Sequence, residues 1–299
     1  MGIIPTPVLK LVWKNTERGD IKRLSAQSAP DGVTEICDIP YIDDGKWQHK
    51  LDVYFPENME NEKLPVIIDI HGGGWMYGDK ELNKYYNMVL ASKGFTVFSM
   101  SYTLWPETTV PEQLKEIAEA LSFIKNQLSS YPCDPKKIML TGDSAGGQLA
   151  LYSAVLSESS VLRGVFSVKD CGLKFTCLGL VSPVPDMNSN SPMSAYTRGM
   201  WGKNYASSPT SRYMNFKDIA KFAQLPPTVL ITSSGDFLAE KQTIATYEKI
   251  KDLGVKAELY NYGKTNGKHL PHVFSVLYPY SDEGNDAIDK MLDFYRETF

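Results

Sequence analysis

The segment Gly142-Asp143-Ser144-Ala145-Gly146 places a serine between two glycines. The apolar run KKIML precedes it, and the stretch QLALYSAVL, which has helical character, follows. A serine on such a strand-to-helix turn can act as a nucleophile, because small neighbours permit the sharp turn and the helix N-terminus favours a developing anion. A serine that merely caps the helix is the alternative.

Three consecutive glycines follow a second dense apolar run. The run LPVIIDI leads into His71-Gly72-Gly73-Gly74-Trp75. Glycines are costly in conformational entropy, so three in a row indicate backbone N–H groups that point at a ligand, as in an oxyanion hole. A flexible turn is the alternative. We expect His71 to hold this loop rather than to transfer a proton.

A serine hydroxyl is a poor nucleophile at neutral pH, so it needs a base and an acid that orients the base. Asp236 follows the apolar run PPTVLIT, and His272 follows VKAELYNY. The chain order Ser144, Asp236, His272 is the order of α/β-hydrolases. His269 is a rival candidate for the base, and Asp186, after CLGLVSP, is a rival candidate for the acid.

The composition indicates a globular protein. The chain has 299 residues, of which 42% are hydrophobic and 22% charged, and its net charge is −4. It is long enough for a large buried core. No block of like charges indicates a nucleic-acid or membrane surface. The four cysteines lack metal-ligand spacing, so we expect free thiols, and we expect no metal or other cofactor.

The N-terminal stretch lacks a basic region followed by an uninterrupted apolar one, so we expect no signal peptide. No run reaches the ~18 apolar residues of a membrane-spanning helix. We therefore expect a cytoplasmic protein that acts on a small molecule, without nucleic-acid or membrane partners. Its oligomeric state is open.

Apolar runs alternate with stretches of helical periodicity after an antiparallel start. Strands are predicted at 34–42, 49–56, 64–70, 95–102, 136–142, 174–183, 226–236 and 255–262. Helices are predicted at 81–93, 111–130, 145–157, 238–253 and 282–298. The alternation predicts an α/β domain with a mostly parallel sheet, in which ligands bind beyond the carboxyl ends of the strands. We expect a single domain over 1–299, with a cap or lid insertion at 185–225.

Together these motifs resemble the α/β-hydrolase superfamily, and more closely its hormone-sensitive-lipase-like branch of esterases. The resemblance runs from about residue 35 to the end, except for much of 185–215. Its motifs are HGGGW, SYTLWPE, CDPKKIMLTGDSAGGQLAL, LPPTVLITSSGDFLAE and His-x-Phe at His272 to Phe274. The segment Gly78-Asp79-Lys80 after HGGGW is also similar to bacterial short-acyl and carbohydrate esterases of this group.

The resemblance implies a fold and a set of roles. The fold would be the α/β-hydrolase fold, with a small or reduced cap. Ser144 would be the nucleophile, Asp236 the acid and His272 the base, since the His-x-Phe match favours His272. The oxyanion hole would be formed by the backbone N–H groups of Gly73, Gly74 and Ala145.

Two features depart from the family pattern. Family members usually have Tyr-Arg-Leu-Ala-Pro-Glu where this chain has Tyr102-Thr103-Leu104-Trp105-Pro106-Glu107, so a structural arginine is missing. There is also little chain before the first strand, where larger relatives place a helical cap. A reduced cap favours smaller acyl groups. Candidates for the pocket lining are Trp75, Tyr102, Trp105 and Trp201, and packing in the core is the alternative for each.

The expected activity is that of a serine carboxylic ester hydrolase that acts through an acyl-enzyme. The expected substrates are esters of short acyl groups, from acetyl to butyryl, and they include acetylated carbohydrates. An amidase, an aryl-formamidase or a peptidase of the same fold is the alternative enzyme. A catalytically silent ligand-binding protein is the alternative of another class, and it would be expected to lack the nucleophile or the base.

Overall fold

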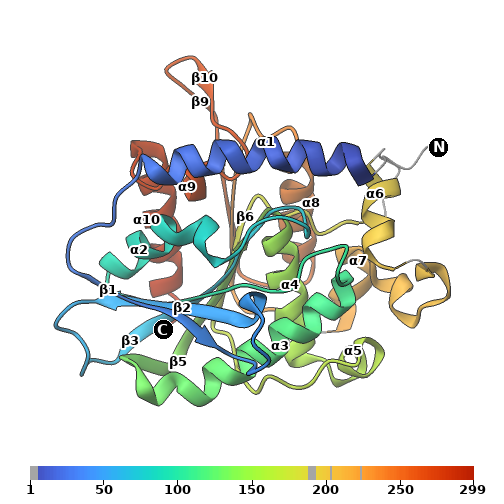
Figure 1. The fold of residues 1–299 in the computed structure, drawn as a ribbon, viewed down its shortest axis with the longest axis horizontal. Coiled ribbons are helices and arrows are strands. Elements are labelled where there is room, and N and C mark those ends of the chain that lie inside the picture. Colours follow the sequence, from blue (N-terminus) through green and yellow to red (C-terminus); the bar gives the residue numbers. More distant parts are fainter. Residues whose placement is uncertain (1–5, 188–192, 203, 223) are drawn as a thin grey trace.

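The computed structural model describes residues 6–187, 193–202, 204–222 and 224–299 (Figure 1). Residues 1–5 of the N-terminal stretch lie outside these ranges. So do residues 188–192, 203 and 223 of the predicted lid insertion.

Within the described residues, an eight-stranded sheet forms the centre of the molecule, in the order β1-β2-β4-β3-β5-β6-β7-β8. The first three strands in this order pair antiparallel, and those from β4 to β8 pair parallel. The strands span Val33–Pro40 (β1), Lys50–Pro56 (β2), Leu64–Ile70 (β3), Thr96–Met100 (β4), Cys133–Asp143 (β5), Cys177–Val181 (β6), Thr228–Ser233 (β7) and Ala257–Tyr262 (β8). This architecture confirms the predicted α/β-hydrolase fold.

Helices cover both faces of the sheet, which explains the continuous apolar runs of the strands. On β3, successive side chains point to opposite faces: Ile68 belongs to the cluster with α3 and α4, and Ile67 belongs to the cluster with α2 and α10. The predicted helices are present as Lys84–Ser92 (α2), Val110–Gln127 (α3), Ser144–Glu158 (α4), Glu240–Asp252 (α8) and Asp282–Arg296 (α10).

Several short elements are additional to those predicted. They are Ser160–Phe166 (α5), Phe274–Leu277 (α9) and a hairpin of Lys264–Thr265 (β9) with Lys268–His269 (β10). Each is too short for a reliable periodic pattern. The hydroxyl of Ser159 caps α5 by accepting a hydrogen bond from the Leu162 N–H group.

The segment between β6 and β7 holds Met193–Met200 (α6), Phe216–Ile219 (α7) and several 3-10 turns. Its apolar side chains do not all face outwards, since Met187, Met200 and Trp201 are buried in the main core cluster. The segment therefore packs on the body through part of its length, and its role as a cap or lid stays a prediction.

A helix that the sequence pattern did not locate precedes the first strand. It spans Thr6–Ser25 (α1), and Figure 1 shows it lying along one side of the molecule. Two contacts anchor its C-terminal end. Arg23 donates a hydrogen bond to the carbonyl of Leu82, and Gln27 donates one to the carbonyl of Leu277 in α9.

Candidate active site

Ser144 lies on a sharp turn between β5 and α4. Its φ of 53° is in the left-handed region, which is strained for a residue other than glycine. A Cβ atom on Gly146 would lie 2.0 Å from the carbonyl oxygen of Ile70, so only glycine permits this approach of α4 to β3. Asp143, not Ser144, is the N-cap residue of α4. The reading of Ser144 as a helix cap is therefore wrong.

The structure brings three predicted residues into one hydrogen-bonded chain. The Ser144 Oγ atom lies 2.9 Å from Nε2 of His272, and Nδ1 of His272 lies 2.8 Å from Oδ2 of Asp236. Asp236 follows β7, and His272 precedes α9. When Nδ1–H donates to Asp236, Nε2 is left to accept the serine proton, which is the arrangement that a general base requires.

Asp236 is held in place by its surroundings. Its side chain is buried, and its Oδ1 atom accepts hydrogen bonds from the N–H groups of Leu238 and Ala239. Burial by itself would raise the pKa of this carboxyl, but the hydrogen bond and charge of His272 hold the pKa below its usual value. The carboxylate is therefore ionised at neutral pH.

The rival candidates lie elsewhere. The His269 ring is on the exposed β9–β10 hairpin, where its Nδ1 atom is 3.4 Å from Oγ of Ser234. Asp186 accepts a hydrogen bond from the N–H group of Phe216. In the part of the chain that the structure describes, neither is hydrogen-bonded to Ser144 or His272, so the geometry favours Asp236 and His272.

The glycine loop (residues 71–77) lies beside the serine turn. The Gly72 N–H group donates to Oδ1 of Asp143 at 2.9 Å. Gly73 and Gly74 both have positive φ, 104° and 58°, which L side chains rarely adopt. Ala145 is in the first turn of α4, where N–H groups lack partners within the helix. These conformations fit an oxyanion hole, and the assignment of Gly73, Gly74 and Ala145 to it stays a prediction.

His71 has the surroundings of a structural residue. It is buried, its Nδ1 atom lies 2.7 Å from the carbonyl oxygen of Gly72, and its ring stacks on Tyr102 at 4.5 Å. Burial lowers the pKa of His71 to about 4. The imidazole is therefore neutral near pH 7 and holds the glycine loop.

A buried polar network beneath the site was missed in the sequence. The amide of Asn83 donates to Asp143 at 2.8 Å and to Asp69 at 3.0 Å, and Asn87 donates to Asp69 at 3.1 Å. Burial raises the pKa of Asp69 to about 7, and the nearby charge of Asp143 adds to the effect. The signal in the sequence was Asp69 in the middle of the apolar run of β3.

Three of the four aromatic residues proposed for the pocket lie in the core. Trp75 donates from Nε1 to Gln148, Tyr102 donates to the carbonyl of His71, and Trp201 donates to Thr210. All three are buried, which favours the packing alternative for them. Trp105 is partly buried.

The missing family arginine corresponds to Thr103. Its backbone N–H group donates to Glu116 at 2.7 Å, and its hydroxyl lies 3.3 Å from Nε2 of His49. His49 also lies 2.8 Å from Asp44. A neutral residue at this position is thus accommodated by a local polar network.

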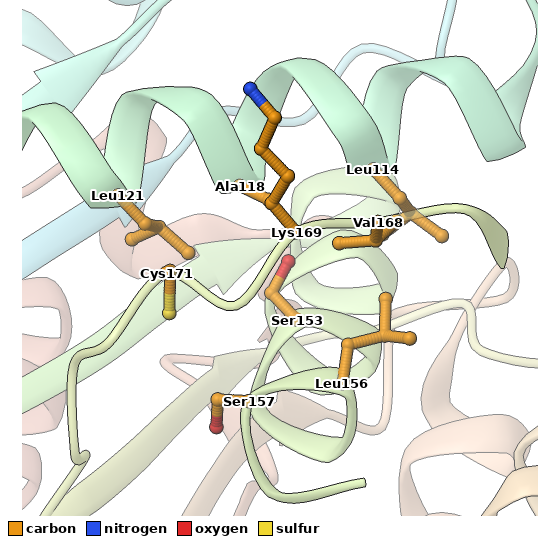
Figure 2. A pocket seen from close by; sticks show the side chains of 9 residues that line it. All are labelled: Leu114, Ala118, Leu121, Ser153, Leu156, Ser157, Val168, Lys169 and Cys171. Carbon is orange, nitrogen blue, oxygen red and sulfur yellow. The ribbon is translucent and has the colours of Figure 1, made fainter. Parts of the chain in front are cut away.

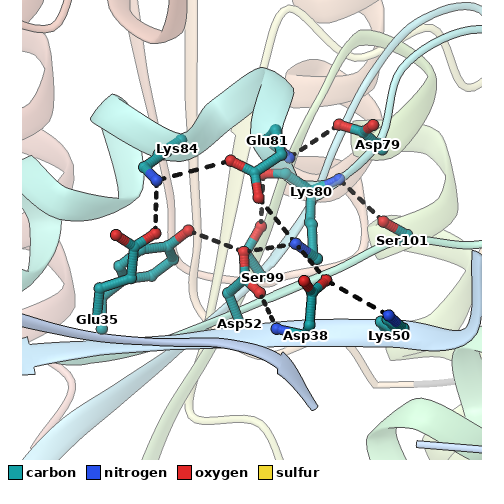
Figure 3. Close-up of polar contacts among 11 residues, drawn as sticks. Glu35, Asp38, Lys50, Asp52, Asp79, Lys80, Glu81, Lys84, Ser99 and Ser101 are labelled. Carbon is teal, nitrogen blue, oxygen red and sulfur yellow. Dashed lines mark hydrogen bonds and ion pairs between the residues drawn. The ribbon is translucent and has the colours of Figure 1, made fainter. Parts of the chain in front are cut away.

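The Gly78-Asp79-Lys80 motif continues into a cluster of charges in which Lys80 and Asp52 are buried (Figure 3). The Lys80 ammonium lies 3.0 Å from Asp52 and 2.8 Å from Glu81. Glu35, Cys37 and Asp52 bring potential metal ligands within 4.8 Å of one another. Because Lys84 pairs with Glu35 at 2.7 Å and Lys80 pairs with Asp52, the carboxylates already have cationic partners.

Two hollows lie away from Ser144, and neither belongs to the candidate active site. One lies beneath α3 and is lined by Leu114, Ser153 and Cys171 among others (Figure 2). Its volume of about 10 Å³ is room for at most one water molecule. A second, open hollow between α2 and α10 is lined by Lys93, Asp286 and Asp289 among others. Neither includes a residue of the Ser144–His272–Asp236 chain.

No helix among the described residues is both long and apolar enough to cross a membrane.

Comparisons with known proteins identify the family of the chain. The family model BD-FAE matches residues 51–215. Esterase B of Lactobacillus rhamnosis, solved with a C4-C4 tributyrin phosphonate inhibitor, is 30% identical over 98% of this chain and 94% of its own, with a TM-score of 0.92. The carboxylesterase EstE1 from a metagenomic library is 22% identical with a TM-score of 0.73, which shows the shared fold.

A curated relative is the isoprenylcysteine alpha-carbonyl methylesterase of Arabidopsis thaliana, 26% identical over 230 residues, 73% of this chain and 54% of that protein. The chain thus spans about half the length of this relative. The chain belongs to the BD-FAE family of the α/β-hydrolases, and these relatives support the resemblance to hormone-sensitive-lipase-like esterases proposed from the motifs.

Proposed function

We propose that the chain is a serine carboxylic ester hydrolase with Ser144 as nucleophile, His272 as base and Asp236 as orienting acid. The observation that carries the proposal is the continuous hydrogen-bonded chain from Ser144 through His272 to the buried Asp236. The nucleophile, the base and the acid are thus within the contact distances that acyl transfer requires.

In the first half of the reaction, Nε2 of His272 accepts the proton of Ser144 as Oγ attacks the ester carbonyl carbon. Asp236 stabilises the imidazolium that forms, and it keeps the ring oriented. The negative charge that develops on the carbonyl oxygen is stabilised by the N–H groups of Gly73, Gly74 and Ala145. Preorganised donors of this kind are effective because they need no reorganisation during the reaction.

The second half repeats these steps with water. The alcohol leaves with the proton from His272, and Ser144 remains acylated. A water molecule then gives a proton to His272 and attacks the acyl carbon. Collapse of the second intermediate returns the proton to Ser144 and releases the carboxylic acid.

The proposed substrates are esters with acetyl to butyryl groups. The support comes from esterase B, which is 30% identical and was solved with a C4-C4 tributyrin phosphonate. Acetylated carbohydrates belong to the same proposal, because an acetyl group presents the same short acyl chain. Of the four aromatic candidates, Trp105 is the partly buried one, and we assign substrate contact to it first.

The test is a series of p-nitrophenyl esters from acetate to decanoate, beside an acetylated sugar and an N-formyl aryl amide. We expect the highest kcat/KM between acetate and butyrate, and a loss of turnover in Ser144→Ala with unchanged thermal unfolding. A faster amide reaction would replace the proposal by an amidase. Full turnover in Ser144→Ala would remove Ser144 from the mechanism.

A further inference from the structure

Tyr77 connects the glycine loop to helix α1. Its ring stacks on Trp13 with 5.1 Å between centroids and 19° between planes, and its hydroxyl donates to Oδ2 of Asp20 at 3.0 Å. Both partners are on α1, which is far from residue 77 in sequence. The Tyr77 side chain is therefore held by α1 through an apolar contact and a polar one.

The backbone of Tyr77 packs against Gly73. The N–H group of Tyr77 donates to the carbonyl of Gly73 at 3.0 Å. A Cβ atom on Gly73 would lie 2.0 Å from the carbonyl oxygen of Tyr77. Gly73 is thus in close contact with Tyr77. A shift of Tyr77 would move the Gly73 carbonyl and, with it, the N–H group of Gly74 in the same peptide, which belongs to the proposed oxyanion hole.

Helix α1 is itself tied to the body on its C-terminal side. Asp20 pairs with Arg23 at 3.1 Å, Arg23 donates to the carbonyl of Leu82 at 3.1 Å, and Gln27 donates to the carbonyl of Leu277 at 2.9 Å. Leu277 ends α9, the short helix that follows His272. Most helical stability in proteins comes from tertiary packing, so these contacts also maintain the helix that holds Tyr77.

We propose that Tyr77 is a positioning residue for the oxyanion hole, and that α1 keeps it in place through Trp13 and Asp20. The inference rests on the proposed function and adds a role for α1 in the chemical step. Under this proposal α1 does more than cover the site. Its attachment determines where the Gly74 N–H group points, because that group shares a peptide with the Gly73 carbonyl that Tyr77 holds.

If α1 no longer holds Tyr77, the displaced oxyanion donor should weaken binding of the transition state more than binding of the substrate. Removal of one oxyanion donor costs roughly 10²–10³ in kcat, and a displaced donor costs a fraction of that. We expect Trp13→Ala to lower kcat by about tenfold or more, with KM within about twofold of its original value. Tyr77→Phe, which keeps the ring and loses the bond to Asp20, should have a smaller effect in the same direction.

The experiment uses the full chain and p-nitrophenyl butyrate, with two matched controls. Tyr280→Phe also removes one hydroxyl hydrogen bond, to the carbonyl of Ser28, which lies outside the glycine loop. Trp47→Ala removes a tryptophan that is 51% exposed. Thermal unfolding of every variant shows whether the fold is kept.

A trifluoromethyl ketone provides the readout that a purely structural role would not change. Its carbonyl carbon adds Oγ of Ser144, the serine proton passes to His272, and the ketone oxygen becomes an oxyanion. We expect Trp13→Ala and Tyr77→Phe to weaken inhibition by the same factor as kcat, while both controls behave as the original chain.

Unchanged kcat in both variants would overturn the proposal. So would a rise in KM at constant kcat, since it would make α1 a part of the substrate site. The proposed function fails separately, by the absence of ester turnover in the original chain or by its persistence in Ser144→Ala.

Discussion

Gly146→Ala is the substitution for which the structure gives the clearest magnitude. The added Cβ atom would lie 2.0 Å from the carbonyl oxygen of Ile70 and 2.4 Å from that of His71. Both are backbone atoms at the end of β3, so no flexible side chain can move aside. The start of α4 would have to move away from β3.

The required movement is large for a catalytic group. Ordinary contacts of a Cβ atom begin at 3.4 Å, so α4 must shift by more than about 1 Å, and a misplacement of that size costs about 10²-fold in rate. Overpacking of this kind costs about 1–3 kcal/mol in stability. We therefore expect Gly146→Ala to lose at least about 10²-fold in kcat and to unfold at lower denaturant concentration.

The assay combines initial rates on p-nitrophenyl butyrate with denaturant unfolding. Gly164→Ala is the matched control, because Gly164 is in α5 and a Cβ atom there meets nothing within 4 Å. This control should keep its activity and gain about 0.5–1 kcal/mol, since alanine is the better helix former. Activity and stability of Gly146→Ala equal to those of the original chain would refute the close approach of α4 to β3.

Three further predictions concern buried carboxylates. In the fold, burial raises the pKa of Asp69 from its ordinary value of 3.8 to about 7. The contribution of its protonated form to the free energy of unfolding is therefore complete below pH 3.8 and is lost as the pH rises to about 7. Asp69→Asn should therefore make the slope of unfolding free energy against pH more positive in that window, by up to about 1.4 kcal/mol per pH unit; an unchanged slope in urea titrations would contradict it. Lys80→Met leaves the fully buried Asp52 without its ammonium partner, so it should lower the free energy of unfolding by about 3–5 kcal/mol. The double variant with Asp52→Leu should recover stability. Equal stability of the single variant and the original chain would show that the pair contributes nothing. Asp236→Asn should lower kcat about 10⁴-fold, because it changes the tautomer of His272. Thermal unfolding should stay close to that of the original chain. A decrease in kcat of less than tenfold would rule out the orienting role of Asp236.

Much of the fold followed from local patterns. The apolar run before His71 and the one before Gly142 are buried parallel strands, as predicted, because both faces of such strands are covered. The strand ends also placed Ser144, Asp236 and His272 at one edge of the sheet, where the structure brings them together. Chain order and position beyond a strand indicated the candidates, but the choice of His272 over His269 came from the His-x-Phe match.

Other features depend on contacts between distant segments, which local patterns do not contain. Asp69 and Asp143 become neighbours of Asn83 only when β3, β5 and the turn before α2 are assembled. The docking of Trp13 on Tyr77 likewise depends on where α1 packs. Trp201 gave no signal that separates a buried anchor from a pocket residue, because tryptophan serves both purposes.

Covalent labelling with a phosphonate shows whether Ser144 is the nucleophile. The chain is treated with a p-nitrophenyl alkylphosphonate until ester turnover stops, and then intact mass and peptide mapping locate the adduct. We expect one phosphonyl group per chain, on Ser144, and no labelling of Ser144→Ala under the same conditions. An adduct on another residue with loss of turnover, or an unlabelled and folded protein that still hydrolyses esters, would contradict it.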